Sequence, residues 1–235
     1  MRFQTELVPA RLVKRYKRFL ADCVLEDGGQ DVTAHCANPG SMMGLAEPGT
    51  HIWLEPNDDP KKKLKFGWRL VDHENGHFTG VDTSLPNRAL KTALMAREIA
   101  PFAHYQMVRP EVKYGENSRI DFILSGPDLP DLYVEVKSVT LSRRQGLAEF
   151  PDSVTKRGAK HLDELARVLE QGHRAAMLYL VQRTDCSEFT LASDIDPAYA
   201  AAYEAARTAG VETFCLGTNI TPQGVDITDP LTLRL

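Results

Sequence analysis

The feature that most constrains the fold is the apolar run AAMLYLVQR at residues 175–183. Its apolar residues do not alternate with polar ones, which is typical of a β-strand buried on both faces. Such a strand needs a covering layer on each side, and two segments near it have the signals of helices. Residues 153–171 place leucines at helical spacing and end before Gly172, and residues 196–210 begin with an Asp-Pro pair and end in glycine. These patterns predict helices packed against a buried sheet.

The rest of the chain from residue 83 follows the same mixed pattern. A helix is expected over PNRALKTALMAREIA, and Pro86 lies near its start. Five further strands are expected, which gives the order α-β-β-β-α-β-α-β-β and a mixed sheet. They are HYQMVRPEVKYG, SRIDFILSG, LYVEVKSVTL, VETFCLGTNIT and GVDITDPLTLRL.

Residues 1–82 have a different character, because they are rich in short strands and turn residues. Residues 10–25, ARLVKRYKRFLADCVL, read as one strand that ends at the turn Glu26–Gly29. Five short strands separated by turns suit a small closed barrel of the oligonucleotide/oligosaccharide-binding (OB) type. We therefore expect an α+β protein of two domains, a barrel over 1–82 and an α/β domain over 83–235. The other four strands are QDVTAHCA, HIWLEP, LKFGWRLVDHENG and HFTGVDT.

Composition excludes some classes of protein. No run approaches the roughly 18 apolar residues of a membrane helix, and no apolar segment follows the basic N-terminus, so we expect a cytoplasmic protein without a membrane partner. The four cysteines have no paired spacing and are expected to be reduced. The net charge of −4 excludes a histone-like polycation, but residues 1–70 hold 11 Lys and Arg against 9 Asp and Glu. A local basic surface therefore remains compatible with the charge.

Three polar residues on two of the expected strands carry the chemistry. Asp121 in SRIDFIL and both Glu135 and Lys137 in LYVEVKSV lie on the faces opposite their apolar neighbours. If the two strands form a hairpin, the three side chains lie side by side. Two carboxylates suit a hard divalent cation, Mg²⁺ or Mn²⁺, and a lysine can position a nucleophile or stabilise negative charge. The arrangement predicts a two-metal nuclease-type site, with Asp121 and Glu135 as metal ligands and all three residues catalytic.

The tripeptide alone is not specific, because Glu-x-Lys on an amphipathic strand is also typical of an exposed cross-strand contact. The chain contains a second copy, Glu111-Val112-Lys113, with no aspartate on a preceding strand; the nearest one upstream is Asp82, in an expected loop. The α-β-β-β-α-β order around Glu135 favours the nuclease interpretation for that copy. Glu111 is a candidate only for the border of the site.

Longer stretches of the sequence resemble the sugar fermentation stimulation protein A family. The resemblance implies an N-terminal OB-type barrel, a C-terminal domain of the PD-(D/E)xK nuclease-like fold, and an association with DNA binding and sugar-metabolism regulation. It does not settle catalytic activity. The Pro-Asp pair of the wider nuclease pattern is replaced by Ile120-Asp121. The stretches are LVPARLVKRYKRFLADC, HCANPGSM, TSLPNR, VKYGENSRIDFIL, YVEVKSVTL, AEFPDSVTKRGAKHL and LVQRTD.

Basic residues in three places suit the phosphates of DNA, which we expect to be bound with little sequence specificity. The alternative for each group is a solvated surface. Arg143 and Arg144 are expected in a loop at the mouth of the site, and the helix from residue 153 presents a basic stripe near its N-terminus, where a phosphate is favoured. The candidates are Arg11, Lys14, Arg15, Lys17 and Arg18 in the barrel, then Arg143, Arg144, Lys156, Arg157 and Lys160.

Other residues have a simpler interpretation. Gln182, at the end of the buried strand, is either directed to the metal or a local hydrogen-bonding residue, and Glu98 is either a third carboxylate or a solvated helix residue. His35 and Cys36 are expected to be structural. Two hypotheses follow: a DNA-binding protein with a Mg²⁺- or Mn²⁺-dependent phosphodiesterase site, or a non-catalytic DNA-binding regulator on the same scaffold. A weaker third is a sugar-phosphate binder.

Overall fold

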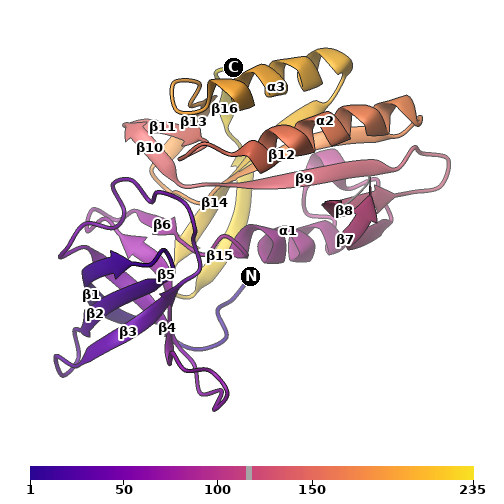
Figure 1. Ribbon diagram of the computed structural model, residues 1–235. Helices are drawn as coiled ribbons and strands as arrows, with labels where there is room; N and C mark the ends of the chain where they lie inside the picture. The colour runs from indigo at the N-terminus through magenta and orange to yellow at the C-terminus, as the bar shows by residue number, and fades with distance from the viewer. Residues whose placement is uncertain (115–117) are drawn as a thin grey trace.

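The computed structural model describes residues 1–114 and 118–235, which form a β-barrel followed by an α/β domain (Figure 1). In the barrel sheet the strand order is β3-β2-β1-β4-β5-β6, and β3 also pairs with β5, which closes the first five strands. The predicted OB-type barrel is confirmed. Its strands are β1 (Val8–Tyr16), β2 (Leu20–Leu25), β3 (Asp31–Cys36), β4 (His51–Pro56), β5 (Phe66–Asp72) and β6 (Phe78–Gly80).

The single strand predicted over residues 10–25 is wrong. A tight turn at Lys17 and Arg18, where φ is +48° and +63°, divides the segment into the antiparallel strands β1 and β2, with Tyr16 opposite Leu20. Such turns usually contain asparagine or glycine, which tolerate positive φ, and two basic residues give no such signal. The turn places Lys17 and Arg18 at an exposed hairpin tip.

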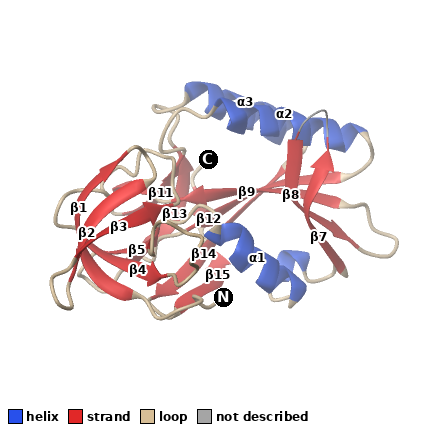
Figure 2. Ribbon diagram, turned by 60° about the horizontal axis from the view of Figure 1, so that its bottom comes forward, coloured by secondary structure: helices blue, strands red, loops and turns tan. Residues whose placement is uncertain are grey.

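The α/β domain is built on a six-stranded mixed sheet with helices on both faces. Helix α1 covers one face, and α2 and α3 lie side by side on the other (Figure 2). The strand order is β15-β14-β12-β9-β8-β7. The elements are α1 (Leu85–Met95), a 3₁₀ turn (Ala100–Phe102), β7 (Met107–Tyr114), β8 (Ser118–Ser125), β9 (Leu132–Val139), α2 (Lys156–Glu170), β12 (Arg174–Val181), α3 (Pro197–Ala209), β14 (Glu212–Thr221) and β15 (Gly224–Pro230).

Strand β12 is the buried centre that the apolar run predicted. It pairs in parallel with β9 on one side and β14 on the other, and every residue from Ala175 to Val181 is buried. Tyr179 packs towards α2 and α3, whereas Leu178 packs towards α1. The two-sided burial explains why polar residues are absent from this run.

A second sheet, of four short strands, does not follow from the sequence patterns. Its order is β10 (Leu141–Arg144), β11 (Gly146–Phe150), β13 (Cys186–Leu191) and β16 (Thr232–Leu233). Arg143 and Arg144, predicted in a loop, therefore lie on β10, and the predicted last strand divides into β15 and β16. These strands are only two to six residues long, which is too short for a clear periodic pattern. β10 and β11 form a tight hairpin, whereas β13 and β16 join them from distant parts of the sequence.

The two domains share hydrogen bonds and a small apolar core. Gly80 of β6 donates its backbone N–H to Gln182 O at 2.9 Å, and Phe78 N donates to Thr184 Oγ1 at 3.0 Å. An apolar cluster that includes Leu70 of the barrel and Ile220 of the larger sheet fills the contact. The barrel is thus bonded to the end of the central strand.

No helix within residues 1–114 and 118–235 has the length and apolar character needed to cross a membrane. Gly115, which ends one predicted strand, and residues 115–117 of the VKYGENSRIDFIL stretch lie outside the described part of the chain.

Candidate metal and nucleic-acid site

The site lies where strand β8 separates from its neighbours. Pairing between β8 and β9 covers Phe122–Leu124 and stops before Asp121, and pairing with β7 passes over Glu111, which has φ +54°. Since β8 has no regular ladder partner at Asp121, its carboxylate turns to the backbone of β9 and accepts a hydrogen bond from Val136 N at 2.7 Å. The broken ladder thus brings Asp121 beside the Glu135–Lys137 segment.

A second donor fixes Asp121 from helix α1. Asn87 Nδ2 donates to Asp121 Oδ1 at 2.6 Å. Burial, together with the nearby charge of Glu135, raises the pKa of Asp121 to about 6, although the bonds from Val136 and Asn87 and the charge of Lys137 act in the opposite direction. Burial and the charge of Glu135 thus both disfavour the ionised form of Asp121, which a nearby cation would favour.

Glu135 is held through only one of its oxygens. Its side chain is buried, with 3% of the residue exposed, and Oε1 accepts from Lys137 Nζ at 2.9 Å and from His161 Nδ1. Burial alone would raise the pKa of Glu135, but His161 and Lys137 together hold it below its usual value. Oε2 has no hydrogen-bond partner among the described residues. A buried carboxylate oxygen without a partner is costly, and a cation beside it would offset that cost.

His161 is the site residue whose role the sequence did not show. It lies on α2, which begins at Lys156 rather than at Ser153 because Thr155 caps it by accepting from Gly158 N at 3.1 Å. Arg157 Nε donates to His161 Nε2 at 3.1 Å, so His161 must carry its proton on Nδ1 and donate it to Glu135. The spacing of Arg157 and His161 shows a shared helix face, but the sequence could not place that face over Glu135.

Asn87 was also missed as a site residue. It occurs in the TSLPNR stretch, but its position on α1 opposite Asp121 depends on packing of α1 across the sheet.

The donor set fits one hard divalent cation. Among residues 1–114 and 118–235, no group of three or more His, Cys, Asp or Glu side chains is arranged to hold a metal ion. Asp121 and Glu135 would be its two charged ligands, and Mg²⁺ commonly takes only one or two carboxylates and completes its shell with water and phosphate oxygens. The two carboxylates are sufficient charged ligands for one such cation, and the two-metal site stays a prediction.

Most of the predicted basic residues of the barrel have local partners. Arg11 pairs with Glu26 at 3.0 Å and with Glu74 at 2.8 Å, and Lys14 lies 3.4 Å from Asp22. Arg15 donates to three backbone carbonyls, among them those of Asn38 and Gly40, so it supports the NPGS loop. Lys17 and Arg18, by contrast, are exposed and form no ion pair with any described residue.

The basic residues of the α/β domain divide in the same way. Arg143 binds Glu149 at 2.7 Å and Asp194 at 2.6 Å. Lys160 lies 3.5 Å from Glu164, whereas Lys156 and Arg144 are exposed and have no acidic partner in the described chain. The exposed cations of this domain lie at the N-terminus of α2 and on strand β10.

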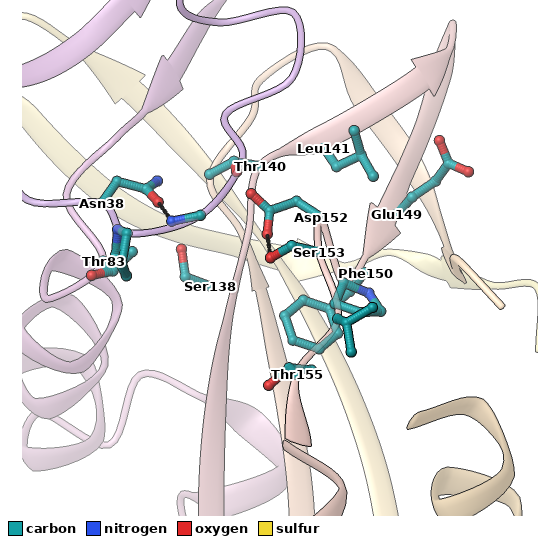
Figure 3. Close-up of a pocket in the computed structure, with 14 residues that line it drawn as sticks. Asn38, Thr83, Ser138, Thr140, Leu141, Glu149, Phe150, Asp152, Ser153 and Thr155 are labelled. Carbon is teal, nitrogen blue, oxygen red and sulfur yellow. Dashed lines mark hydrogen bonds between the residues drawn. The ribbon is translucent and has the colours of Figure 1, made fainter. Parts of the chain in front are cut away.

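A hollow of about 290 Å³ lies between the two domains, beside the end of β9 (Figure 3). It is bordered by Asn38 of the barrel loop, Ser138 of β9 and Thr155 before α2. Ser41 Oγ donates to Asp152 O at 2.8 Å, and a β-carbon at Gly40 would overlap the Asp152 carboxylate. The NPGS loop therefore packs directly against the segment that leads into α2.

The remaining candidates do not enter the site. Gln182 is fully buried and donates to Ser138 Oγ at 2.7 Å, which is a hydrogen-bonding role at the domain contact. Glu98 lies outside α1 and is exposed. His35 stacks on the exposed ring of Phe19, and Cys36 is buried in the barrel core. Glu111 is exposed on β7.

Comparison with known proteins agrees with the fold of a barrel followed by an α/β domain. Residues 13–81 match the family described as the SfsA N-terminal OB domain, and residues 84–224 match the sugar fermentation stimulation protein RE domain. The chain belongs to the sugar fermentation stimulation protein (SfsA) family. Two relatives described as sugar fermentation stimulation protein homologs, from Roseobacter denitrificans and Ruegeria pomeroyi, are 75% and 78% identical over 235 and 231 residues. The alignments cover 100% and 98% of this chain and all of each relative.

The fold is also similar to a solved structure. Pyrococcus furiosus SfsA, described in complex with Ca²⁺, superposes with a TM-score of 0.88 at 24% identity, over 100% of this chain and 98% of that one. At this identity the likeness establishes the fold alone.

Proposed function

We propose that this SfsA-family protein binds DNA and hydrolyses phosphodiester bonds with one divalent cation, Mg²⁺ or Mn²⁺, held between Asp121 and Glu135. The observation that carries the proposal is the unpartnered, buried Glu135 Oε2. It lies beside a second carboxylate, Asp121, whose pKa is raised by burial and by the charge of Glu135. The Ca²⁺ described with the Pyrococcus furiosus relative supports the choice of a hard, oxygen-binding ion.

The residues around the cation position would divide the work. Arg157 and His161 fix the orientation of Glu135, and Asn87 and Val136 N fix that of Asp121. Such outer partners keep ligands in a productive geometry before substrate arrives. When bound, the cation supplies Lewis-acid polarisation of the phosphodiester and makes water more acidic.

Lys137 would bind the substrate itself. Its ammonium lies 2.9 Å from Glu135 Oε1 and its side chain is only 14% exposed, so it is held at the edge of the site. From this position it can donate to a non-bridging phosphate oxygen and stabilise negative charge as the phosphodiester is attacked.

Exposed cations in both domains suggest how DNA would be held. Lys17 and Arg18 at the barrel hairpin, and Arg144 and Lys156 of the α/β domain, have no competing acidic partner in the described chain. They would contact the phosphate backbone, which explains binding with little sequence specificity. We leave Arg11, Arg15 and Arg143 out of this surface because their guanidinium groups are already bound.

A cleavage assay tests the proposal. Purified protein is incubated with single- and double-stranded DNA in Mg²⁺, Mn²⁺ or EDTA, beside Asp121→Ala and Glu135→Ala. We expect metal-dependent cleavage that both variants lose. Cleavage that continues in both variants would overturn the site, and salt-sensitive binding without any cleavage would instead favour the non-catalytic regulator.

A further inference from the structure

A pocket of about 690 Å³, more than twice the volume of the interdomain hollow, lies on the outer face of the barrel. It is bordered by β3, β4 and β5, by the loop at residues 57–65 between the last two, and by the N-terminal segment at residues 4–5. His35 of β3 points outward into it, because the neighbouring Ala34 and Cys36 fill the barrel core. The pocket shares no lining residue with the interdomain hollow and none with the proposed cation site.

A glycine makes room for a flat cation in this pocket. Gly67 of β5 pairs with His35 of β3 on one side and with Glu55 of β4 on the other. A β-carbon at Gly67 would approach the Arg69 guanidinium to 3.3 Å, so the guanidinium lies against the strand where a side chain would otherwise be. Arg69 Nε donates to Glu55 Oε2 at 2.7 Å and Nη1 donates to Asp82 Oδ2 at 2.5 Å. Arg69 Nη2 has no hydrogen-bond partner among the described residues, so a fixed cation keeps one donor for a ligand.

Exposed rings lie beside this guanidinium. The ring of His35 stacks on that of Phe19, with centroids 6.3 Å apart and planes inclined by 20°. His35 is exposed, and 44% of Phe19 is exposed where the β1–β2 hairpin turns back into the barrel. Aromatic rings and arginine planes are the surfaces on which unpaired bases stack. The pocket and the hairpin therefore offer several planar groups to solvent within one region of the barrel.

Cations accompany these planar groups. Lys62 and Lys63 line the pocket, are exposed, and form no ion pair with any described residue. Of the two acids in the lining, Glu55 is already paired with an arginine, and only Asp58 is exposed. The basic turn at residues 17–18 adds two more cations directly before the exposed hairpin ring. Planar groups for bases and lysines for phosphates are together typical of a surface that binds a single nucleic-acid strand.

We propose that this barrel surface binds single-stranded DNA, with an unpaired base stacked on Arg69 and His35 and the adjoining phosphates at the lysines of the β4–β5 loop. The inference rests on the DNA binding of the proposed function and not on its cleavage step. In a duplex each base is covered on both faces by its neighbours and cannot stack on the protein without leaving the helix. The surface should therefore select single strands over duplexes, with little preference among bases, because every base has a face that can stack.

Substitutions of exposed residues test the surface without disturbing the barrel core. His35→Ala should weaken binding of oligo(dT) of about 15 nucleotides roughly tenfold, through loss of base stacking, and leave duplex binding unchanged. His104→Ala is the matched control, because His104 is also exposed and also lies against a ring, that of Tyr105 at 4.4 Å, but in the α/β domain. Lys62→Ala combined with Lys63→Ala should reduce the slope of log affinity for oligo(dT) against log salt by about 1.4, since each lost phosphate contact removes about 0.7.

Fluorescence anisotropy with labelled oligo(dT) and a duplex of the same length, in EDTA, measures binding apart from cleavage. Tighter binding of oligo(dT), weakened by His35→Ala and not by His104→Ala, supports the proposal even if the protein cleaves nothing. Oligo(dT) binding that His35→Ala or the lysine double variant leaves unchanged, or an equal loss with the duplex, overturns the barrel site and leaves the nuclease proposal intact. Competition by thymidine monophosphate as strong as that by oligo(dT) would assign the pocket to a small ligand and overturn it too, and no binding to any DNA would overturn both proposals.

Discussion

The two copies of Glu-Val-Lys, at residues 135–137 and 111–113, have identical sequences and very different surroundings. Glu135 is buried under α2, bound by His161 and placed beside Asp121. Glu111 is exposed on the edge strand β7, at a residue with φ +54° where the β-ladder is interrupted. Asp82, the acid upstream of the second copy, is already paired with Arg69 at 2.5 Å and Arg88 at 3.3 Å.

The difference shows that the tripeptide obtains its chemistry from its position in the sheet. A carboxylate on a solvated edge strand keeps ordinary properties, because water stabilises its charge. The same carboxylate on an inner strand must find donors or a cation. The predictions below compare the two copies under matched substitutions.

Glutamine replacement of the two glutamates should give the largest contrast. Glu135→Gln removes a charged cation ligand, and we expect cleavage to fall on the order of 1,000-fold, since a bound cation contributes several kcal/mol to such reactions. Glu111→Gln should stay within about twofold of wild type, because surface changes have little effect. Steady-state cleavage rates in saturating Mg²⁺ measure both. A comparable loss in the two variants would remove the distinction between the copies.

Alanine replacement of the two lysines should separate turnover from binding. Lys137→Ala should lower kcat by about 100-fold, since Lys137 lies at the proposed site of charge development. Lys113→Ala should leave kcat unchanged, weaken DNA binding a few-fold, and reduce the slope of log affinity against log salt by about 1. Cleavage kinetics and salt titrations of binding give the two readouts. A kcat defect in Lys113→Ala would contradict the assignment.

Replacement of His161, which binds Glu135 in the copy at residues 135–137, should weaken the affinity of the site for its cation. His161→Asn loses the Arg157–His161–Glu135 chain of hydrogen bonds, and we expect a 10- to 100-fold weaker Mn²⁺ affinity, as for other partners that orient metal ligands. The dependence of Tm on Mn²⁺ concentration measures it. At saturating Mn²⁺ the variant should recover most of its kcat; a kcat defect that excess metal does not correct would show a different role.

The smallest expected effect is a pH-dependent difference in folding stability between Asp121→Asn and the wild type, measured without metal. Because the pKa of Asp121 is raised to about 6, its proton stabilises the folded state at low pH, and this contribution is lost as pH rises through 6. In EDTA at pH 8, Asp121→Asn should therefore be more stable than wild type by about 1 kcal/mol, and the gain should disappear near pH 4. Urea unfolding at both values measures it. Glu111→Gln is the control, and an unchanged Asp121→Asn stability would show that the ionised Asp121 costs the folded state nothing.

Some of the fold and site could be predicted from the sequence, and the limits have physical causes. The apolar run of β12 and the capping signals of α3 are local, and both predictions are confirmed. Asp121, Glu135 and Lys137 alternate with apolar residues, so their faces were readable. The hairpin turn at Lys17 and Arg18 lacks the asparagine or glycine that usually marks such turns, and β10 is only four residues long. The place of His161 depends on tertiary contacts, which leave no periodic pattern.

The Asn87 bond to Asp121 illustrates the limit best. Nothing near Asn87 in the sequence indicates that α1 crosses the sheet at the point where β8 leaves β9. The sequence therefore indicates which residues have suitable chemistry, and the packing of α1 and α2 determines which of them meet.

The central claim is that Glu135, and not its copy Glu111, holds a divalent cation. Calorimetric titration with Mn²⁺ of the wild type, Glu135→Gln and Glu111→Gln tests it without any assumption about substrate or catalysis. We predict one binding site in the wild type, the same site and affinity in Glu111→Gln, and no measurable binding in Glu135→Gln. Unchanged Mn²⁺ binding by a folded Glu135→Gln would contradict the account.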